Sequence, residues 1–257
     1  MRKLVKSFKV LRRDNSIWKL FFFYLNNFLG KKKLVCLKLY GDNVTLRTST
    51  TDFTVALSCL GGEFNTLSTC FPKNSEGLII DAGGYIGTAA IALSKMYPNA
   101  TIVTIEPSSD NFEILIKNIN GHKNIYALNA ALMPNTIVGG VDLMNRGTGN
   151  WGFTVIEKPQ DRAASFIEKV DSISIEVLLE RFNYKKIMIF KMDIEGGEYA
   201  MFGRKDDWLN KTDVLMIELH ERIVPGCERA FYEANAGRYI YKESGEKYVS
   251  VGKSFFV

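Results

Sequence analysis

The chain has 257 residues, of which 46% are hydrophobic and 24% charged; these ordinary values for a globular protein allow one α/β domain with a full core and an extension. Its four cysteines show no Cys-x-x-Cys spacing, which excludes a disulfide-dense secreted framework and favours free thiols in a reducing compartment. Residues 1–33 hold ten Lys or Arg and one acid, whereas the remainder carries 23 basic and 27 acidic residues. We therefore expect electrostatic partners to meet residues 1–33, and we expect no nucleic-acid partner.

Residues 1–33 predict a basic helical extension. Leu4, Phe8 and Leu11 recur at helical spacing among Lys and Arg, the pattern of a basic amphipathic helix. A second apolar stripe, from Ile17 to Leu29, is too short and too interrupted to span a membrane, and no small-residue cleavage site follows it. Two interpretations stay open for this extension: packing on the rest of the chain or on a second copy in a homodimer, or peripheral contact with an anionic membrane.

Residues 34–76 predict a hairpin and a helix that lead into the core. Lys33 to Tyr40 and Val44 to Arg47 flank a Gly-Asp-Asn turn, which is typical of a β-hairpin. Phe53 to Leu60 reads as helical, and we expect this region to cover a ligand cleft.

Residues 77–257 alternate strand and helix patterns, which predicts a mostly parallel sheet with helices on both faces. We expect helices at Thr88 to Leu93, after a capping box of Asp110 and Glu113, and at Ser172 to Phe182. A C-terminal antiparallel hairpin is expected around Ser244 and Gly245. The expected parallel strands are Leu78 to Asp81, Thr101 to Glu106, Ile125 to Leu132, Lys186 to Met192 and Val214 to Leu219.

The stretch from Asp81 to Gly87 reads as a tight glycine turn between a strand and a helix. Gly83, Gly84 and Gly87 allow positive φ and let a ligand lie against bare backbone. Ala82 stands where a dinucleotide-binding motif has its first glycine, and the carboxylate of Asp81 would repel a pyrophosphate. A ligand that carries a cation, such as the amino group of S-adenosylmethionine, fits better. A nicotinamide-dependent oxidoreductase is the alternative from another enzyme class.

Polar residues follow the other predicted strands, where ligands bind in open α/β sheets. Glu106 comes 19 residues after Gly87, and an acid at this place can accept the hydroxyl protons of a ribose. The remaining residues at strand ends are Asn129, Ala130, Asp193, Glu195, Glu218 and His220.

Five segments together resemble the FkbM family of S-adenosylmethionine-dependent methyltransferases. They are 81–87, 103–107, 129–132, 191–198 (Lys-Met-Asp-Ile-Glu-Gly-Gly-Glu) and 217–220, within a resemblance that covers about residues 44–257. The resemblance implies a class I methyltransferase fold, which is Rossmann-like, and S-adenosylmethionine as cofactor. It places Asp81, Gly83 and Gly87, with Gly84 and Tyr85 between them, at the methionine portion, Glu106 at the ribose, Asn129 and Ala130 at the adenine, and Asp193 at the methyl-transfer centre. Tyr85 departs from the family, which usually has Asn there.

Transfer to a hydroxyl requires a group that takes its proton. The candidates are Asp193, His220 and Glu218, since crowded acids raise one another's pKa and His titrates near neutrality. Asp193, Glu195 and Glu218 offer the oxygen ligands that Mg²⁺ prefers, although nothing in their spacing demands a metal. We expect Trp151 and Glu195 to bind the acceptor. Tyr85, Asn150 and Phe153 are further candidates for the acceptor site. Trp151 sits in a glycine-rich segment and either stacks on a sugar or anchors the loop.

The sequence thus predicts an O-methyltransferase. The resemblance makes a sugar hydroxyl of a glycan or glycolipid precursor the expected acceptor, in polysaccharide biosynthesis, in the cytoplasm and at the inner membrane face if the extension touches lipid. A non-catalytic methyltransferase-like assembly factor is a further alternative, for which the substituted Tyr85 is the only sequence hint.

Overall fold

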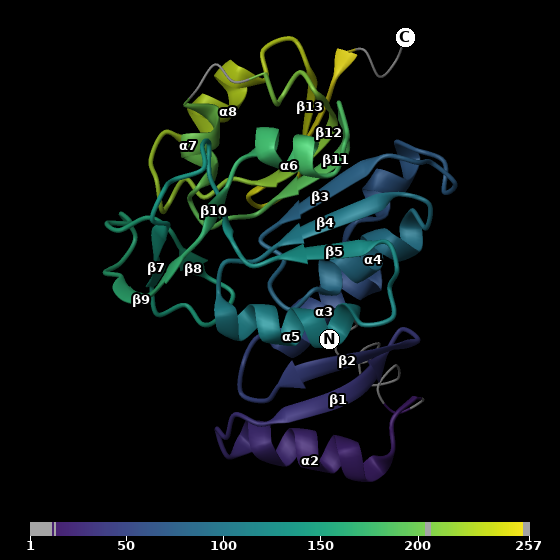
Figure 1. Cartoon of the computed structure of the whole chain (residues 1–257). Coiled ribbons are helices and arrows are strands. Elements are labelled where there is room, and N and C mark those ends of the chain that lie inside the picture. Colours follow the sequence, from purple (N-terminus) through teal and green to yellow (C-terminus); the bar gives the residue numbers. More distant parts are fainter. Residues whose placement is uncertain (1–11, 13, 204–206, 254–257) are drawn as a thin grey trace.

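The computed structural model describes residues 12, 14–203 and 207–253. Seven strands form the central sheet, in the order β13-β14-β12-β11-β3-β4-β5 (Figure 1). Neighbouring strands run parallel except at β14, which is antiparallel to both β12 and β13. The mostly parallel Rossmann-like sheet and the C-terminal antiparallel hairpin are therefore confirmed. The strands are β3 (Leu78–Ala82), β4 (Thr101–Ile105), β5 (Ile125–Leu128), β11 (Ile187–Met192), β12 (Thr212–Glu218), β13 (Tyr239–Ser244) and β14 (Lys247–Val251).

Helices cover both faces of this sheet, and as a result every residue of its central strands β3 and β11 is buried. Alternate residues of β3 point to opposite faces: Leu78 and Ile80 join one apolar cluster, and Ile79 joins another. The first cluster includes side chains of α6 (Ile175–Arg181), α7 (Glu198–Phe202) and α8 (Cys227–Ala234), and the second includes side chains of α4 (Thr88–Met96) and α5 (Ser109–Ile119).

The N-terminal region forms a separate layer against α5. The predicted hairpin is confirmed as β1 (Leu34–Leu39) and β2 (Asp42–Arg47), which pair antiparallel. It carries α2 (Ile17–Phe28), whose Leu20 and Phe23 share a buried cluster with the hairpin and with Ile114 of α5. The helix predicted around Leu4, Phe8 and Leu11 lies outside the described residues. Within the described ranges, the structure has no helix of sufficient length and apolarity to traverse a membrane.

The segment that joins this layer to the sheet is helical. It consists of α3 (Asp52–Ser58), the π-helical turn η1 (Cys59–Glu63) and the 3₁₀ turn η2 (Asn65–Thr69). The helix expected from Phe53 to Leu60 thus ends as α-helix at Ser58, and a π turn with Gly62 at a φ of 109° follows. Only glycine adopts this φ easily, so Gly62 is the residue that lets the chain leave the helix here.

Three local predictions were wrong. Ser108, not Asp110, caps α5: its side chain accepts a hydrogen bond from the backbone N–H of Asn111, and Asp110 lies within the first turn. The third strand is interrupted after Leu128, and its second part, β6 (Ala131–Leu132), pairs with β10 (Ser172–Ile173) outside the central sheet. Consequently the helix predicted from Ser172 begins only at Ile175, after the N-cap Ser174.

A small three-stranded sheet was not predicted. It has the order β8-β7-β9 and consists of β7 (Val141–Asn145), β8 (Phe153–Thr154) and β9 (Ser165–Val170). Figure 1 shows it on the side of the central sheet where the arrows of the parallel strands end. Most side chains of β9 are exposed, so its sequence lacks the alternation that marks a half-buried strand.

Candidate functional site

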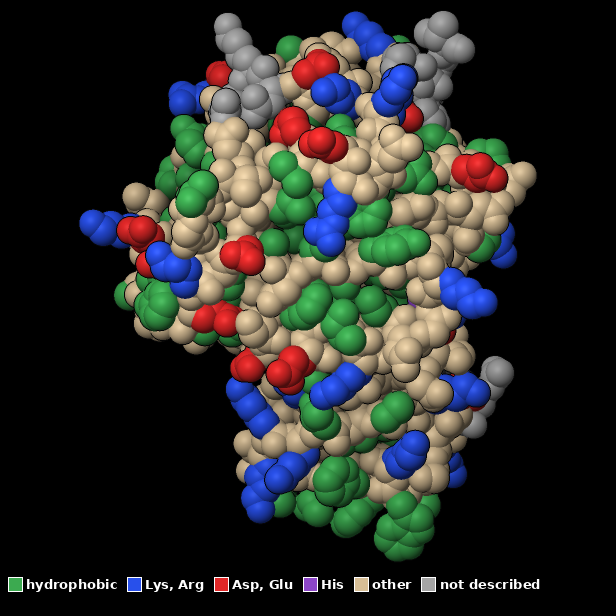
Figure 2. Space-filling model, viewed as in Figure 1, with side chains coloured by type: hydrophobic (Ala, Val, Ile, Leu, Met, Phe, Trp, Pro, Cys, Tyr) green, Lys and Arg blue, Asp and Glu red, His purple; other side chains and the backbone are tan. Residues whose placement is uncertain are grey.

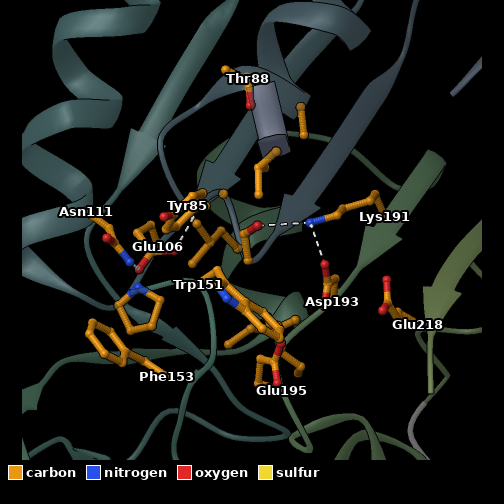
Figure 3. A pocket seen from close by; sticks show the side chains of 18 of the residues that line it. Tyr85, Thr88, Glu106, Asn111, Trp151, Phe153, Lys191, Asp193, Glu195 and Glu218 are labelled. Carbon is orange, nitrogen blue, oxygen red and sulfur yellow. Dashed lines mark hydrogen bonds and ion pairs between the residues drawn. The ribbon is translucent and has the colours of Figure 1, made fainter. Parts of the chain in front are cut away.

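A cavity of about 290 Å³ opens at the carboxyl ends of β3, β4 and β11. Residues of α3 and η1 line one side of it, and residues of the segment that joins β7 to β8 line another. Its volume lies at the lower end of the range for small-molecule sites. Figure 3 shows Glu106 and Asn111 on one side of this space and Lys191 and Asp193 on the other. The predicted site residues that line it are Gly83, Gly84, Tyr85, Glu106, Ala130, Trp151, Asp193, Glu195 and Glu218.

The glycine turn brings two parts of the backbone close together. A Cβ on Gly83 would lie 1.8 Å from the carbonyl oxygen of Asp193, and one on Gly84 would lie 2.2 Å from the hydroxyl of Thr104. Gly83 also has a φ of 80°, which disfavours any other residue. Because the backbone N–H of Asp193 donates to the carbonyl of Ala82, the turn after β3 and the turn after β11 are fixed against each other. These glycines therefore set the floor of the cavity.

Glu106 is held in place by three N–H donors. Its Oε2 accepts from the backbone N–H of Tyr85 at 2.8 Å, and its Oε1 accepts from the backbone of Ser108 and from Nδ2 of Asn111, each at 3.0 Å. Burial nevertheless raises the pKa of Glu106 to about 7, with the hydrogen bonds acting in the opposite direction. A buried carboxylate so fixed beside a cavity presents its remaining lone pair, on Oε2, to a ligand that donates a hydrogen bond.

Asp81 lies beneath the cavity and does not line it. Its carboxylate accepts from the hydroxyl of Thr104 and lies 3.3 Å from Nζ of Lys191. Lys191 lines the cavity, donates to the carbonyl of Gly83 and lies 3.7 Å from Asp193. Burial lowers the pKa of Lys191, but the charges of Asp81 and Asp193 outweigh it, so the net pKa is above its ordinary value. Lys191 was not predicted as a site residue. It could have been, because it is the one charged residue in the otherwise apolar strand β11.

His220 sits behind Asp193 and Glu195. Its Nδ1 lies 3.0 Å from Glu198, whose carboxylate is fixed by the backbone N–H groups of Ile194 and Gly196. Its Nε2 lies 3.7 Å from Asp193 and 3.6 Å from Glu195 and has no hydrogen-bond partner. Burial lowers the pKa of His220, but these acids, Glu198 foremost, raise it to a net value of about 10.

The predicted role of His220 as a base is therefore not what this geometry favours. The ring is fully buried, does not line the cavity and keeps its proton at neutral pH. Asp193 and Glu195 both line the cavity, and Asp193, whose side chain is one-third exposed, is the more accessible of the two.

Glu195 is oriented by a buried arginine that the sequence analysis missed. Nη1 of Arg146 donates to Oε2 of Glu195 at 2.7 Å, and Nη2 donates to Asp161 at 3.3 Å. Burial raises the pKa of Glu195 to about 7, and the neighbouring His220 opposes this shift. Arg146 directly follows β7. Because the small sheet that contains β7 was not predicted, the sequence did not place Arg146 near the site.

Asp193, Glu195 and His220 each offer one ligand atom within a group that spans no more than 4.8 Å. A divalent cation held by these three residues would require His220 to give up the proton that its acidic neighbours stabilise. From the sequence, Asp193, Glu195 and Glu218 were possible Mg²⁺ ligands that no spacing required. The ligand atoms of Glu218 lie instead with those of His220 and Glu246 in a second group.

The remaining predicted residues act mainly on their neighbours. Gly87 is the N-cap of α4 in the left-handed region, and the Asn129 side chain donates to the carbonyls of Glu106 and Pro107. The hydroxyl of Tyr85 donates to Asp52, away from the cavity, and Arg47 stacks over the Tyr85 ring at 5.4 Å. Gly87 and Asn129 do not line the cavity.

The aromatic residues of the segment between β7 and β8 reach the cavity. Trp151 is partly exposed and lines it together with Asn150 and Phe153. The carbonyl of Asn150 accepts a hydrogen bond from Nδ2 of Asn111, the same side chain that binds Glu106. This bond ties the segment to the rim of the cavity, and Figure 3 shows the Trp151 ring between Glu106 and Asp193.

Comparison with known proteins gives one family. The sequence model of one protein family, described as the methyltransferase FkbM domain, matches residues 81–236. A curated relative, Methyltransferase 1 of Beauveria bassiana (strain ARSEF 2860), is 24% identical over 165 residues, which are 58% of this chain and 66% of that protein. The chain therefore spans just under two thirds of that relative's length.

Solved structures show more distant likenesses. An O-methyltransferase from Bacillus cereus in complex with SAH is 14% identical, with a TM-score of 0.43 over 74% of this chain and 80% of that one. A SAM-dependent methyltransferase from Aquifex aeolicus is 13% identical, with a TM-score of 0.41 over 76% of this chain and 89% of that one. Because these TM-scores are below 0.5, nothing about activity follows from them.

Proposed function

The chain belongs to the FkbM methyltransferase family, and we propose that it transfers a methyl group from S-adenosylmethionine to the oxygen of a sugar hydroxyl. The proposed acceptor is a glycan or glycolipid precursor. The observation that carries the cofactor assignment is the fixed carboxylate of Glu106 at the end of β4, beside the glycine turn that follows β3. An acid at this place in a Rossmann-like sheet accepts hydrogen bonds from ribose hydroxyls.

The residues of the cavity fit such a nucleoside. Glu106 would accept from the ribose, and Ala130, which lines the cavity beside it, leaves room for the adenine. Lys191 and Asp193 lie across the cavity from Glu106, where Lys191 would meet the methionine portion and Asp193 the methyl-transfer centre. Tyr85 does not close this space, because its hydroxyl is bound to Asp52. Tyr85 therefore gives less support to the alternative of a non-catalytic assembly factor.

When bound, S-adenosylmethionine would supply a methyl carbon already activated by the sulfonium: the acceptor oxygen bonds to this carbon as the carbon–sulfur bond breaks and S-adenosylhomocysteine leaves. The chain's own task is then to orient the acceptor and to take its proton. Asp193 is the group that would accept this proton, since it lines the cavity and its side chain is one-third exposed. His220 would position Asp193 and Glu195 through its buried ring, which Glu198 orients.

The acceptor side of the cavity favours a ring-shaped, hydroxyl-rich molecule. Trp151 offers an aromatic face, on which the apolar face of a sugar can pack. Glu195, which lines the same space, offers a carboxylate oxygen that Arg146 does not occupy. Together these groups provide one apolar surface and one hydrogen-bond acceptor for the sugar.

The experiment is methyl transfer from methyl-labelled S-adenosylmethionine to a panel of free and lipid-linked sugars, with the product linkage read by NMR. We expect label in an O-methyl group, abolished in Asp193→Asn and retained in the exposed control Asp207→Asn. Label found only on amines or thiols would refute oxygen as the target, and an inactive protein that fails to bind the cofactor would refute the cofactor assignment.

A further inference from the structure

The helix α2 leaves most of its apolar surface uncovered. Only Leu20 and Phe23 among its large apolar residues are buried, against the β1–β2 hairpin. At about 100° per residue, the exposed apolar positions form one continuous arc of about 160°. Trp18 is 77% exposed and Phe28 is 87% exposed. The exposed apolar residues are Ile17, Trp18, Phe21, Phe22, Tyr24, Leu25, Phe28 and Leu29, and we call them the α2 face.

Cations surround this face. Lys19 lies at its edge on the same helix, and Lys31, Lys32 and Lys33 follow the helix directly; all four are exposed. Asp14 is the only acid in residues 1–33, which carry ten Lys or Arg. Figure 2 shows the hydrophobic side chains gathered at the end of the molecule where α2 lies in Figure 1, with Lys and Arg beside them.

We propose that the α2 face docks on a lipid bilayer that carries anionic headgroups. An amphipathic helix of this kind lies in the interface, with its apolar side chains among the acyl chains and its cations at the headgroups. Trp and Tyr, of which the face has one each, are enriched at this depth of the bilayer. The helix would lie on the membrane rather than cross it, because its 12 residues are too few for a span.

Charge decides between a membrane and a second copy of the chain. A symmetric dimer through the α2 face would bring the basic segment of one copy, with Lys19, Lys31, Lys32 and Lys33 exposed, near the same segment of the other. Like charges across an interface disfavour association, whereas an anionic surface attracts the same segment. This proposal does not depend on the proposed methyl transfer, since it uses no residue of the cavity.

The test is flotation of the full chain with phosphatidylcholine vesicles, with and without about one third phosphatidylglycerol. We expect binding to the anionic vesicles that weakens as salt screens the charges. Trp18→Ser and Phe28→Ser should each weaken binding about tenfold or more, because each removes a large apolar side chain from the lipid. Lys31→Gln with Lys32→Gln and Lys33→Gln should abolish the preference for anionic lipid.

Phe166→Ser on β9 is the matched control, because Phe166 is also an exposed aromatic residue and lies outside α2. It should bind vesicles as the unaltered protein does. The proposal is overturned if the full chain does not float, if Phe28→Ser and Phe166→Ser behave alike, or if the protein is a dimer that Phe28→Ser dissociates. The last result would identify a second copy as the occupant of the face.

Discussion

The cavity and the α2 face depart from ordinary burial in opposite directions. At the cavity, charged side chains are buried: Lys191, Glu195, Glu198 and His220 are all nearly inaccessible. On α2, large aromatic side chains that normally lie inside are exposed. Each of these four charged side chains has an oppositely charged neighbour, so the cost of their burial is offset within the chain. On α2 nothing among the described residues covers the apolar surface, and the compensation that we propose is burial in a bilayer. The buried charges beside the cavity are therefore paired before any ligand binds, whereas the apolar side chains of α2 are proposed to be covered only on a membrane.

The largest effect is expected from removing the proposed proton acceptor. Asp193→Asn should lower turnover by about 10²- to 10⁴-fold, because the amide cannot take the proton of the hydroxyl. The affinity for S-adenosylhomocysteine should change only a few-fold, because Asp193 is proposed to act on the acceptor hydroxyl and not to hold the cofactor. Steady-state kinetics together with calorimetry measure both quantities. Turnover within threefold of the unaltered protein would remove Asp193 from its role.

The pairing of buried charges can be broken at Lys191. Lys191→Met should lower the free energy of unfolding by about 3–5 kcal/mol, because it leaves Asp81 buried without its cation. Urea unfolding measures this loss. The matched control is Asp81→Asn combined with Lys191→Met, which removes both charges and should recover part of the stability. A single variant as stable as the unaltered protein would mean that the pair does not stabilise the cavity floor.

The third prediction concerns pH and Glu106. The pKa of this carboxyl is raised to about 7 in the folded chain, from 4.5 for the free side chain, so ionisation favours the unfolded state. Its contribution to stability is therefore present below pH 4.5 and is lost as the pH rises toward and through 7, by about 3 kcal/mol in total.

Glu106→Gln cannot ionise and should lack this loss. The stability difference between the variant and the unaltered protein should thus shift in the variant's favour between pH 5 and pH 8, by about 3 kcal/mol at most. Thermal unfolding across this range gives the difference. Parallel pH profiles for the two proteins would show that Glu106 is ionised in the folded chain at both pH 5 and pH 8.

The smallest effect is expected on the exposed side of α2. Phe28→Ala should change the free energy of unfolding by less than about 0.5 kcal/mol in the absence of lipid, because the ring is almost fully exposed. Phe23→Ala on the same helix should cost about 3–5 kcal/mol, because that ring is buried in the hairpin cluster. Equal losses for the two variants, measured by urea unfolding, would show that the α2 face is already covered by the chain itself.

The sequence predicted the central sheet well because buried parallel strands are continuous apolar runs, as in Leu78 to Ile80 and Ile187 to Ile189. It did not predict the sheet of β7, β8 and β9, whose short strands are stabilised by each other and by contacts with distant residues such as Glu195. Glu106 and Asp193 could be placed because they follow such strands directly.

The pairing of charges was beyond the reach of the sequence. Asp81 was expected to meet a ligand's amino group, but Lys191 of a strand far along the chain supplies a cation to it first. His220 was expected to be a base, and only the positions of Glu198, Asp193 and Glu195 show why it keeps its proton. Both outcomes depend on which residues of separate strands become neighbours, and no local pattern encodes that.

The most direct test of the central claim is a crystal structure of the chain with S-adenosylhomocysteine. We expect a ribose hydroxyl to donate to Oε2 of Glu106, with the adenine beside Ala130 and the sulfur directed toward Asp193. A nucleoside bound elsewhere, or bound in this cavity with its ribose away from Glu106, would contradict it.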